Sequence, residues 1–153
     1  MNIARKPMMI LVVDDDRDDR DMTLEAFQEC RVLNEIRFVE DGEKLIQYLR
    51  HEGDYADPLS SPRPGLILLD LNMPRMDGRD ALKEIKADHA LRQIPVVIMT
   101  TSKAEEDVFR SYDEGASSFI SKPVRFTELV ETISLLERYW MEIVELPGAS
   151  ERA

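Results

Sequence analysis

Short apolar runs, each about the length of a β-strand, recur along the chain. Continuous runs occupy residues 8–13, 66–69 and 94–99, and such runs are typical of strands buried on both faces of a parallel sheet. Residues 36–39 alternate apolar and polar side chains, which predicts a strand nearer the edge of the sheet. We expect a last short strand at residues 118–121.

Between these runs, apolar residues recur at helical spacing. The spacing predicts helices at residues 22–31, 45–49, 81–88, 104–114 and 125–145. Residues 52–64 hold one glycine, three prolines and two serines, so we expect an exposed loop before the central strand. Because strands and helices alternate five times, we predict an α/β fold with a parallel sheet, helices on both faces and right-handed crossovers.

The composition narrows the function classes. A chain of 153 residues is long enough for one domain. Its net charge of −11 argues against a nucleic-acid binder, which needs a basic face. No apolar run is long enough to span a membrane, and no signal-peptide core follows the first residues. The single cysteine, Cys30, fits a reducing cytoplasm.

Polar side chains stand at the ends of four predicted strands. Asp14 and Asp15 follow the first strand, and Asp70 ends the central one. Thr100 and Lys122 come at the ends of the last two. Each residue alone is more often structural, for example as the cap of a turn or helix. The carboxyl ends of parallel strands meet at one edge of a sheet, however, so we expect these side chains to converge.

Three converging carboxylates need a cation between them to stay ionised. A hard divalent ion such as Mg²⁺ suits oxygen ligands, and together with Lys122 it would balance the charge of the site. Such a site would attract a phosphoryl group, for which an aspartate is a covalent acceptor. Cation, lysine and a hydroxyl would then neutralise and bind the phosphoryl oxygens.

These motifs resemble the receiver domain of two-component response regulators. The resemblance covers roughly residues 8–146, leaving short tails at 1–7 and 147–153, and it implies a flavodoxin-like, doubly wound sheet of order 2-1-3-4-5. It rests on the segments Ile10-Leu11-Val12-Val13-Asp14-Asp15, Leu68-Leu69-Asp70-Leu71-Asn72-Met73-Pro74, Met76-Asp77-Gly78, Val97-Ile98-Met99-Thr100-Thr101 and Ser121-Lys122-Pro123.

The resemblance also implies a role for each residue at the strand ends. Asp70 would be the phosphoacceptor, with Mg²⁺ bound by Asp15 directly, by Asp14 mainly through water, and by the backbone carbonyl of Asn72. Thr100 would be the switch hydroxyl and Lys122 the lysine that contacts the phosphate. The aromatic switch position, often tyrosine in the family, is Phe119 here, so a phenol hydroxyl cannot contribute.

The long loop at residues 52–64 and the extended last helix are similar to those of small stand-alone regulators that pair with phytochrome-type histidine kinases. We therefore expect a cytoplasmic, single-domain switch that receives phosphate from a sensor kinase and catalyses only its own phosphorylation and dephosphorylation. One alternative is a pseudo-receiver that binds partners without phosphorylation. Another is a haloacid-dehalogenase-like phosphatase, which would need an aspartate where this chain has Asn72.

The last helix also predicts a homodimer. Its apolar residues recur at alternating spacings of three and four, as in a helix-pairing seam. The predicted helix is longer than the strand on which it would pack, so its last turns would be left uncovered. We expect a twofold partner to bury them. The residues expected at this interface are Leu136, Tyr139, Trp140, Ile143 and Val144.

Overall fold

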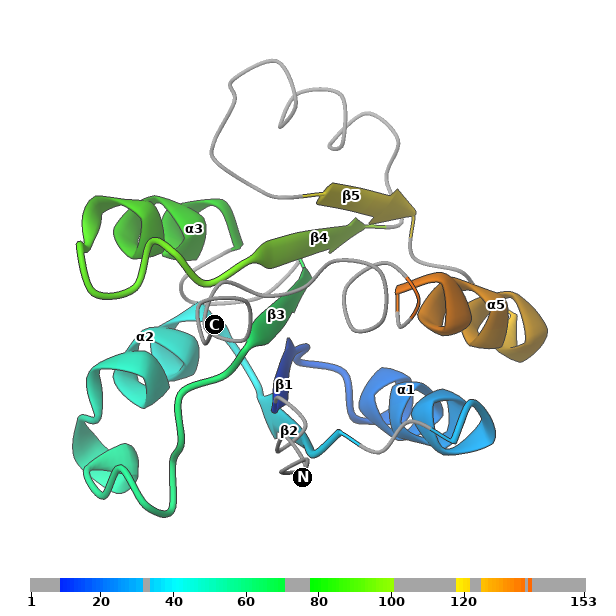
Figure 1. Cartoon of the computed structure of the whole chain (residues 1–153), viewed down its shortest axis with the longest axis horizontal. Helices are drawn as coiled ribbons and strands as arrows, with labels where there is room; N and C mark the ends of the chain where they lie inside the picture. Colours follow the sequence, from blue (N-terminus) through cyan, green and yellow to red (C-terminus); the bar gives the residue numbers. More distant parts are fainter. Residues whose placement is uncertain are drawn as a thin grey trace, which may run out of the picture. The chain divides into compact units, whose positions relative to one another are not determined.

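The computed structural model describes residues 9–31, 34–70, 78–100, 118–121, 125–136 and 138, without the side chains of Thr100 and residues 118–121. Five parallel strands form one sheet in the order β2-β1-β3-β4-β5 (Figure 1). The predicted strand order is therefore confirmed. The strands are β1 (Ile10–Val13), β2 (Ile36–Val39), β3 (Leu66–Asp70), β4 (Val96–Thr100) and β5 (Ser118–Ser121).

The burial of the strands follows their hydrophobic patterns. Every residue of β1 and β3 is buried, as expected for continuous apolar runs in the middle of a parallel sheet. In β2, which lies at the edge, three of the four residues are only half-buried. The alternating pattern of β2 therefore marked an edge strand correctly.

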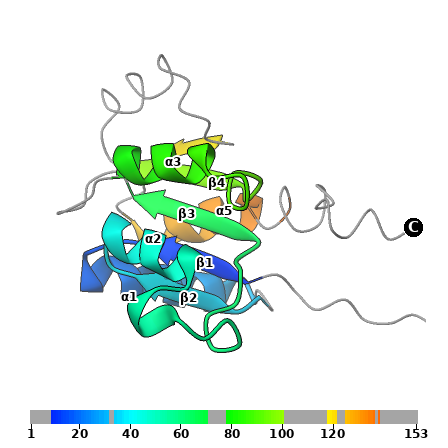
Figure 2. The same ribbon diagram turned by 90° about the vertical axis from the view of Figure 1, so that its left-hand side faces the viewer.

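Two helices cover one face of this sheet. α2 (Gly42–Arg50) and α3 (Gly78–Ala87) lie side by side there (Figures 1 and 2). Their apolar residues, spaced three and four apart, pack in one core with the inward side chains of the strands. This core includes Leu45, Ile46 and Leu49 of α2, Ala81, Leu82 and Ile85 of α3, and Leu11, Val13, Ile67, Leu69 and Ile98 of the sheet.

The segment at residues 52–64 is the exposed loop that the sequence predicted. It contains the short 3₁₀ helix η1 (Gly53–Tyr55), and most of its residues are exposed. The loop is nevertheless bonded to α2, because the Tyr48 hydroxyl donates to the carbonyl of Pro62 at 2.8 Å. His51 is half-buried, and its Nε2 lies 2.9 Å from the carbonyl oxygen of Ser61.

The chain divides into two compact units, and each is described by itself. The first comprises residues 1–20 and 34–122, with the whole sheet, and the second comprises residues 21–33 and 123–153. α1 (Arg17–Glu29) begins in the first unit and continues into the second, which also holds α5 (Phe126–Leu136). In the second unit the Cys30 thiol donates to the carbonyl of Val130 at 3.4 Å.

The described part of α5 changes the interface expected for a dimer. Leu136 is only 5% exposed, so its side chain is already buried within the chain, contrary to the prediction that it contacts a partner. Leu135 beside it is 65% exposed, because neighbouring residues of a helix point to different sides. The other predicted interface residues, Tyr139, Trp140, Ile143 and Val144, lie outside the described residues.

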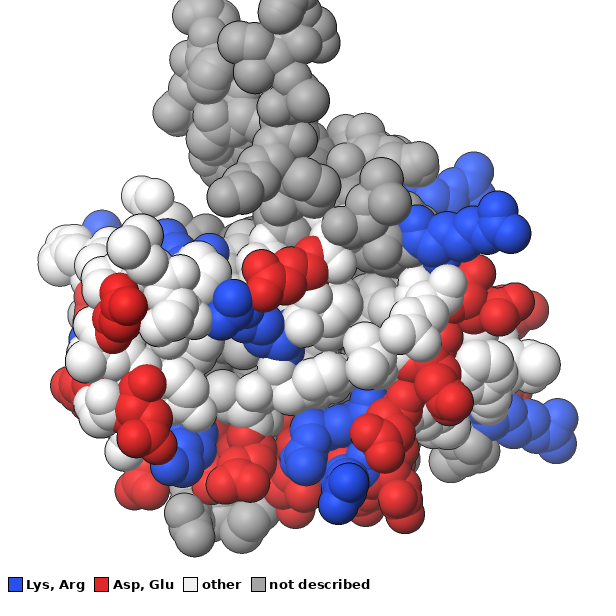
Figure 3. Space-filling model, turned by 90° about the horizontal axis from the view of Figure 1, so that it is seen from below, with Lys and Arg blue, Asp and Glu red and all other residues white. Residues whose placement is uncertain are grey.

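Charged side chains of both signs are interspersed on the surface. Figure 3 shows lysine and arginine next to aspartate and glutamate on one face of the molecule. Examples of such pairs are Arg37 with Glu35 at 2.6 Å and Arg50 with Glu84 at 3.2 Å, which links α2 to α3. Among the described helices, none has the length and apolar character needed to cross a bilayer.

Candidate functional site

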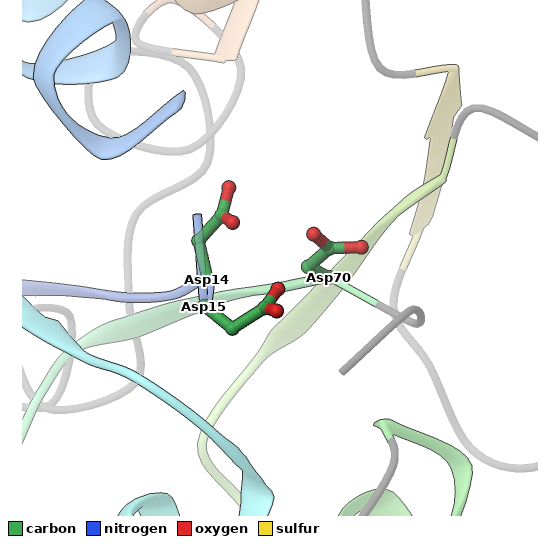
Figure 4. A group of neighbouring side chains, drawn as sticks. All are labelled: Asp14, Asp15 and Asp70. Atoms are coloured by element: carbon green, nitrogen blue, oxygen red, sulfur yellow. The ribbon is translucent and has the colours of Figure 1, made fainter. Parts of the chain in front are cut away.

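Three aspartates meet at the carboxyl edge of the sheet. β1 and β3 are paired with Val13 opposite Leu69, so the next residues of the two strands, Asp14 and Asp70, come level. Asp15 follows directly. One carboxylate oxygen from each of the three residues lies within 4.8 Å of the other two (Figure 4). The convergence expected from the parallel topology is therefore present for these three side chains.

The three carboxylates differ in exposure. Asp14 and Asp70 are buried, with 3% and 7% of their surface exposed, whereas Asp15 is exposed to solvent. One oxygen of Asp14, Oδ1, accepts a hydrogen bond from the main-chain N–H of Asp16 at 3.0 Å. The site therefore combines two buried carboxylates at neighbouring strand ends with one that is exposed.

Asp16 connects this site to the start of α1, a role that the sequence analysis did not assign. Its Oδ1 accepts from the main-chain N–H groups of Asp18 at 2.9 Å and Asp19 at 3.1 Å. This is the arrangement of an N-cap, which satisfies donors left free at the first turn of a helix. An aspartate just before a helix is a known start signal, but here six aspartates in eight residues hide it.

Arg20 is a second residue that the sequence analysis missed. It lies in the first part of α1 and is half-buried, and its Nη1 donates to the main-chain carbonyl of Asp14 at 2.8 Å. No sequence motif predicts this contact, because the two residues are six positions apart and lie in different elements. The turn between β1 and α1 is thus held by side chains from both of its ends.

The remaining predicted site residues are placed only in part. Thr100 ends β4, where it is paired with Ser121 of β5 and follows Met99, the partner of Asp70. Its backbone is therefore at the same edge of the sheet as the three aspartates. Phe119 is paired with Ile98 in the backbone register. Lys122 and Asn72 lie outside the described residues.

The donor set at this edge suits a hard cation. Three carboxylates offer only oxygen atoms, which are the ligands preferred by Mg²⁺ and similar divalent ions. Like charges this close also favour a cation, since they repel one another when the site is empty. Asp14, Asp15 and Asp70 could therefore hold a divalent metal ion.

The five-stranded parallel sheet of this order, with an acidic group at the carboxyl ends of β1 and β3, is the arrangement expected from the resemblance to receiver domains. The sequence profile of the response regulator receiver domain matches residues 10–134. The chain therefore belongs to the response regulator receiver family of two-component systems. This membership sets the haloacid-dehalogenase-like alternative aside.

Similar proteins extend the match over almost the whole chain. Response regulator Rcp1 of Synechocystis sp. is 38% identical over 146 residues, which cover 95% of this chain and 97% of Rcp1. The phosphorylated cyanobacterial phytochrome response regulator RcpA is 40% identical and superposes with a TM-score of 0.82, over 92% of this chain and 99% of RcpA. The Mn²⁺-bound form of Rcp1 superposes with a TM-score of 0.80 at 38% identity, over the same shares.

Proposed function

We propose that the chain accepts a phosphoryl group on Asp70 from the phosphohistidine of a sensor kinase. The observation that carries this proposal is the meeting of Asp70, at the end of the central strand, with Asp14 and Asp15. Of the three, Asp70 is the last residue of β3, the central strand of the sheet, whereas Asp14 and Asp15 follow the end of β1. Asp14 and Asp15 are then the residues that hold the cation.

For transfer of the phosphoryl group, the main contribution of the protein is to hold the reacting groups in position. A carboxylate oxygen of Asp70 attacks phosphorus, the bond from phosphorus to the imidazole nitrogen breaks, and the histidine leaves as neutral imidazole after proton uptake. Asp14 and Asp15 would hold Mg²⁺, together with the main-chain carbonyl of Asn72. When bound, the ion neutralises charge on the phosphoryl oxygens. Lys122 is proposed to contact the same oxygens as a fixed positive charge.

We propose a phytochrome-type histidine kinase as the donor, in the cytoplasm. The support is the similarity to RcpA, which is described as a phytochrome response regulator, and to Rcp1. A red-light-sensing kinase and an unrelated sensor kinase would be compared as donors at equal concentration. Faster transfer from the phytochrome-type kinase is expected, and equal rates from both would contradict this choice of partner.

The output would be a change in the protein-contact surface. Thr100 ends β4 at the edge of the sheet that carries Asp70, and its hydroxyl is proposed to bind the phosphoryl group. Phe119, on the neighbouring strand, is proposed to change its rotamer with it. Thr100→Ala should then accept phosphate and yet show a smaller change in hydrogen exchange on phosphorylation, with Thr101→Ala as the neighbouring control.

We keep a homodimer through the C-terminal helix as part of the proposal, with Tyr139, Trp140, Ile143 and Val144 at the interface. The exposed Leu135 takes the place of the buried Leu136 at its edge. Sedimentation of the wild type and of Trp140→Glu/Ile143→Glu tests this. A monomeric wild type at tens of micromolar, with and without phosphorylation, would rule the dimer out.

The experiment that tests the central step is labelling with acetyl phosphate, which needs no kinase. Wild type, Asp70→Asn and Asp15→Asn would each be incubated with acetyl phosphate in the presence of Mg²⁺ or of EDTA. We expect the wild type to be labelled in the presence of Mg²⁺ and not in the presence of EDTA. Equal labelling of Asp70→Asn would contradict the proposed acceptor, and absence of label on the wild type would favour the pseudo-receiver alternative.

A further inference from the structure

The main chain of Asp14 is held on both sides of the residue. Its N–H donates to the carbonyl of Val39 in β2 at 3.1 Å. Its carbonyl accepts from Nη1 of Arg20 at 2.8 Å. The backbone pairing of β1 with β2 ends at Val13 and Val39, so the guanidinium of Arg20 continues the restraint one residue beyond the ladder.

The carbonyl bound by Arg20 belongs to the peptide that joins Asp14 to Asp15. A peptide is planar, so a bond to its oxygen fixes the direction in which the next residue leaves it. Asp15 is exposed, and its carboxylate nevertheless lies within 4.8 Å of the buried carboxylates. Through this peptide, the bond from Arg20 bears on the direction in which the exposed Asp15 leaves Asp14.

The carboxylate of Asp14 is oriented from the same turn. Its Oδ1 accepts from the N–H of Asp16, and Asp16 caps α1, the helix that carries Arg20. Two contacts from the start of α1 therefore act on Asp14. The N–H of Asp16 orients its carboxylate, and the side chain of Arg20 orients the peptide that follows it. The Nη1 group of Arg20 itself donates to the main-chain oxygen of Asp14.

We propose that Arg20 is a positioning residue for the acidic site. It holds the peptide between Asp14 and Asp15 so that both carboxylates face Asp70 before a divalent cation arrives. This inference rests on the proposed cation site. Groups that orient metal ligands from outside the ligand set typically contribute about 10–100-fold to metal affinity, because a site that is already arranged loses less conformational freedom on binding.

The direction in which cation affinity changes when Arg20 is replaced by a neutral residue distinguishes a positioning role from a purely electrostatic one. Arg20 is a cation close to a cation site, so removing its charge alone would strengthen metal binding. Losing a contact that only stabilises the helix would lower the melting temperature and leave the affinity of the folded protein unchanged. Only a positioning role predicts that the neutral variant binds a cation more weakly.

The test is the affinity for Mn²⁺, measured from the electron paramagnetic resonance signal of the free ion, with melting temperatures taken on the same samples. Arg20→Ala and Arg20→Met remove the donor, and Arg20→Met keeps most of the apolar stem in case Arg20→Ala does not fold. Arg17→Ala, an exposed arginine in the same turn of α1, is the matched control. Arg20→Lys keeps the charge and one donor group.

We expect Arg20→Met to bind Mn²⁺ about 10-fold more weakly than wild type, Arg20→Lys to recover part of this loss, and Arg17→Ala to bind at least as tightly as wild type. Unchanged or tighter binding by both neutral Arg20 variants would overturn the inference. The variant Asp15→Asn tests the cation site separately from the role of Arg20. If its affinity equals that of wild type, the cation site itself is wrong, whereas a loss in Asp15→Asn alone overturns only the role of Arg20.

Discussion

Asp14 and Asp70 stand level on adjacent strands, one step beyond the paired residues Val13 and Leu69. Both are almost fully buried, and one carboxylate oxygen of each lies within 4.8 Å of one of the other. Two negative charges at this distance repel by on the order of 1 to 3 kcal/mol at effective dielectric constants between 80 and 20. The folded protein therefore carries a repulsion that a bound cation relieves.

Removing one of these charges is expected to stabilise the metal-free protein. Asp70→Asn keeps the size of the side chain, and in EDTA its melting temperature should exceed that of wild type by about 2–4 °C for each kcal/mol of repulsion removed. Addition of Mg²⁺ should raise the melting temperature of wild type and change that of Asp70→Asn much less. A wild type that melts at the same temperature with EDTA and with saturating Mg²⁺ would contradict a cation site.

The cap of α1 makes a separate prediction about stability. Asp16→Ala leaves the N–H groups of Asp18 and Asp19 without their acceptor and should cost about 1 kcal/mol, or about 2–4 °C in melting temperature. Asp21→Ala removes an exposed aspartate from the same helix and should have a much smaller effect. Equal losses in the two variants, measured by thermal unfolding, would show that Asp16 has no special role.

The bond from Tyr48 to the loop predicts a further loss of stability. Tyr48→Phe removes the donor to Pro62 and should cost about 0.5–1.5 kcal/mol in the free energy of unfolding. Tyr55→Phe, in the ring that packs on Tyr48 at a centroid distance of 5.2 Å, leaves that bond in place and is the control. Urea unfolding followed by circular dichroism measures both, and equal free energies for Tyr48→Phe and wild type would contradict the role of the bond.

Tyr48 also predicts a dependence on pH. Burial raises the pKa of its phenol above the ordinary value of 10.0, more than the nearby Arg37 lowers it. The unfolded chain then loses this proton at a lower pH than the folded chain, so the stability contributed by the neutral phenol is present below pH 10 and is lost as the pH rises above it. The fall in stability above pH 10 should be shallower in Tyr48→Phe than in wild type.

The fold was predictable because its strands have strong patterns. The continuous apolar runs that became β1 and β3 are typical of strands buried inside a parallel sheet, and the alternation in β2 marked an edge. The acidic site followed from topology, since Asp14, Asp15 and Asp70 come at strand ends that must share one edge. Helix boundaries and the course of the loop at residues 52–64 carried weaker signals.

The supporting contacts could not be predicted in the same way. Arg20 bonds to Asp14 across a turn, and Tyr48 bonds to Pro62, 14 positions further along the chain. Neither separation belongs to the regular spacing of a helix or a strand, so no sequence pattern indicates these bonds. Such bonds depend on where whole elements are placed, and only the folded chain shows that. An N-cap can be predicted from an aspartate just before a helix, but the aspartates next to Asp16 were equally good candidates for this position.

Chemical reduction of the phosphoprotein shows which aspartate carries the phosphoryl group, and so tests the proposal that Asp70 is the phosphoacceptor. Borohydride converts an aspartyl phosphate to homoserine and leaves free aspartate unchanged. The wild type would be labelled with acetyl phosphate and Mg²⁺, reduced, digested and sequenced by mass spectrometry. We expect homoserine at position 70 and unmodified Asp14 and Asp15. Homoserine at position 14 or 15, or its absence from position 70 in labelled protein, would contradict the proposal.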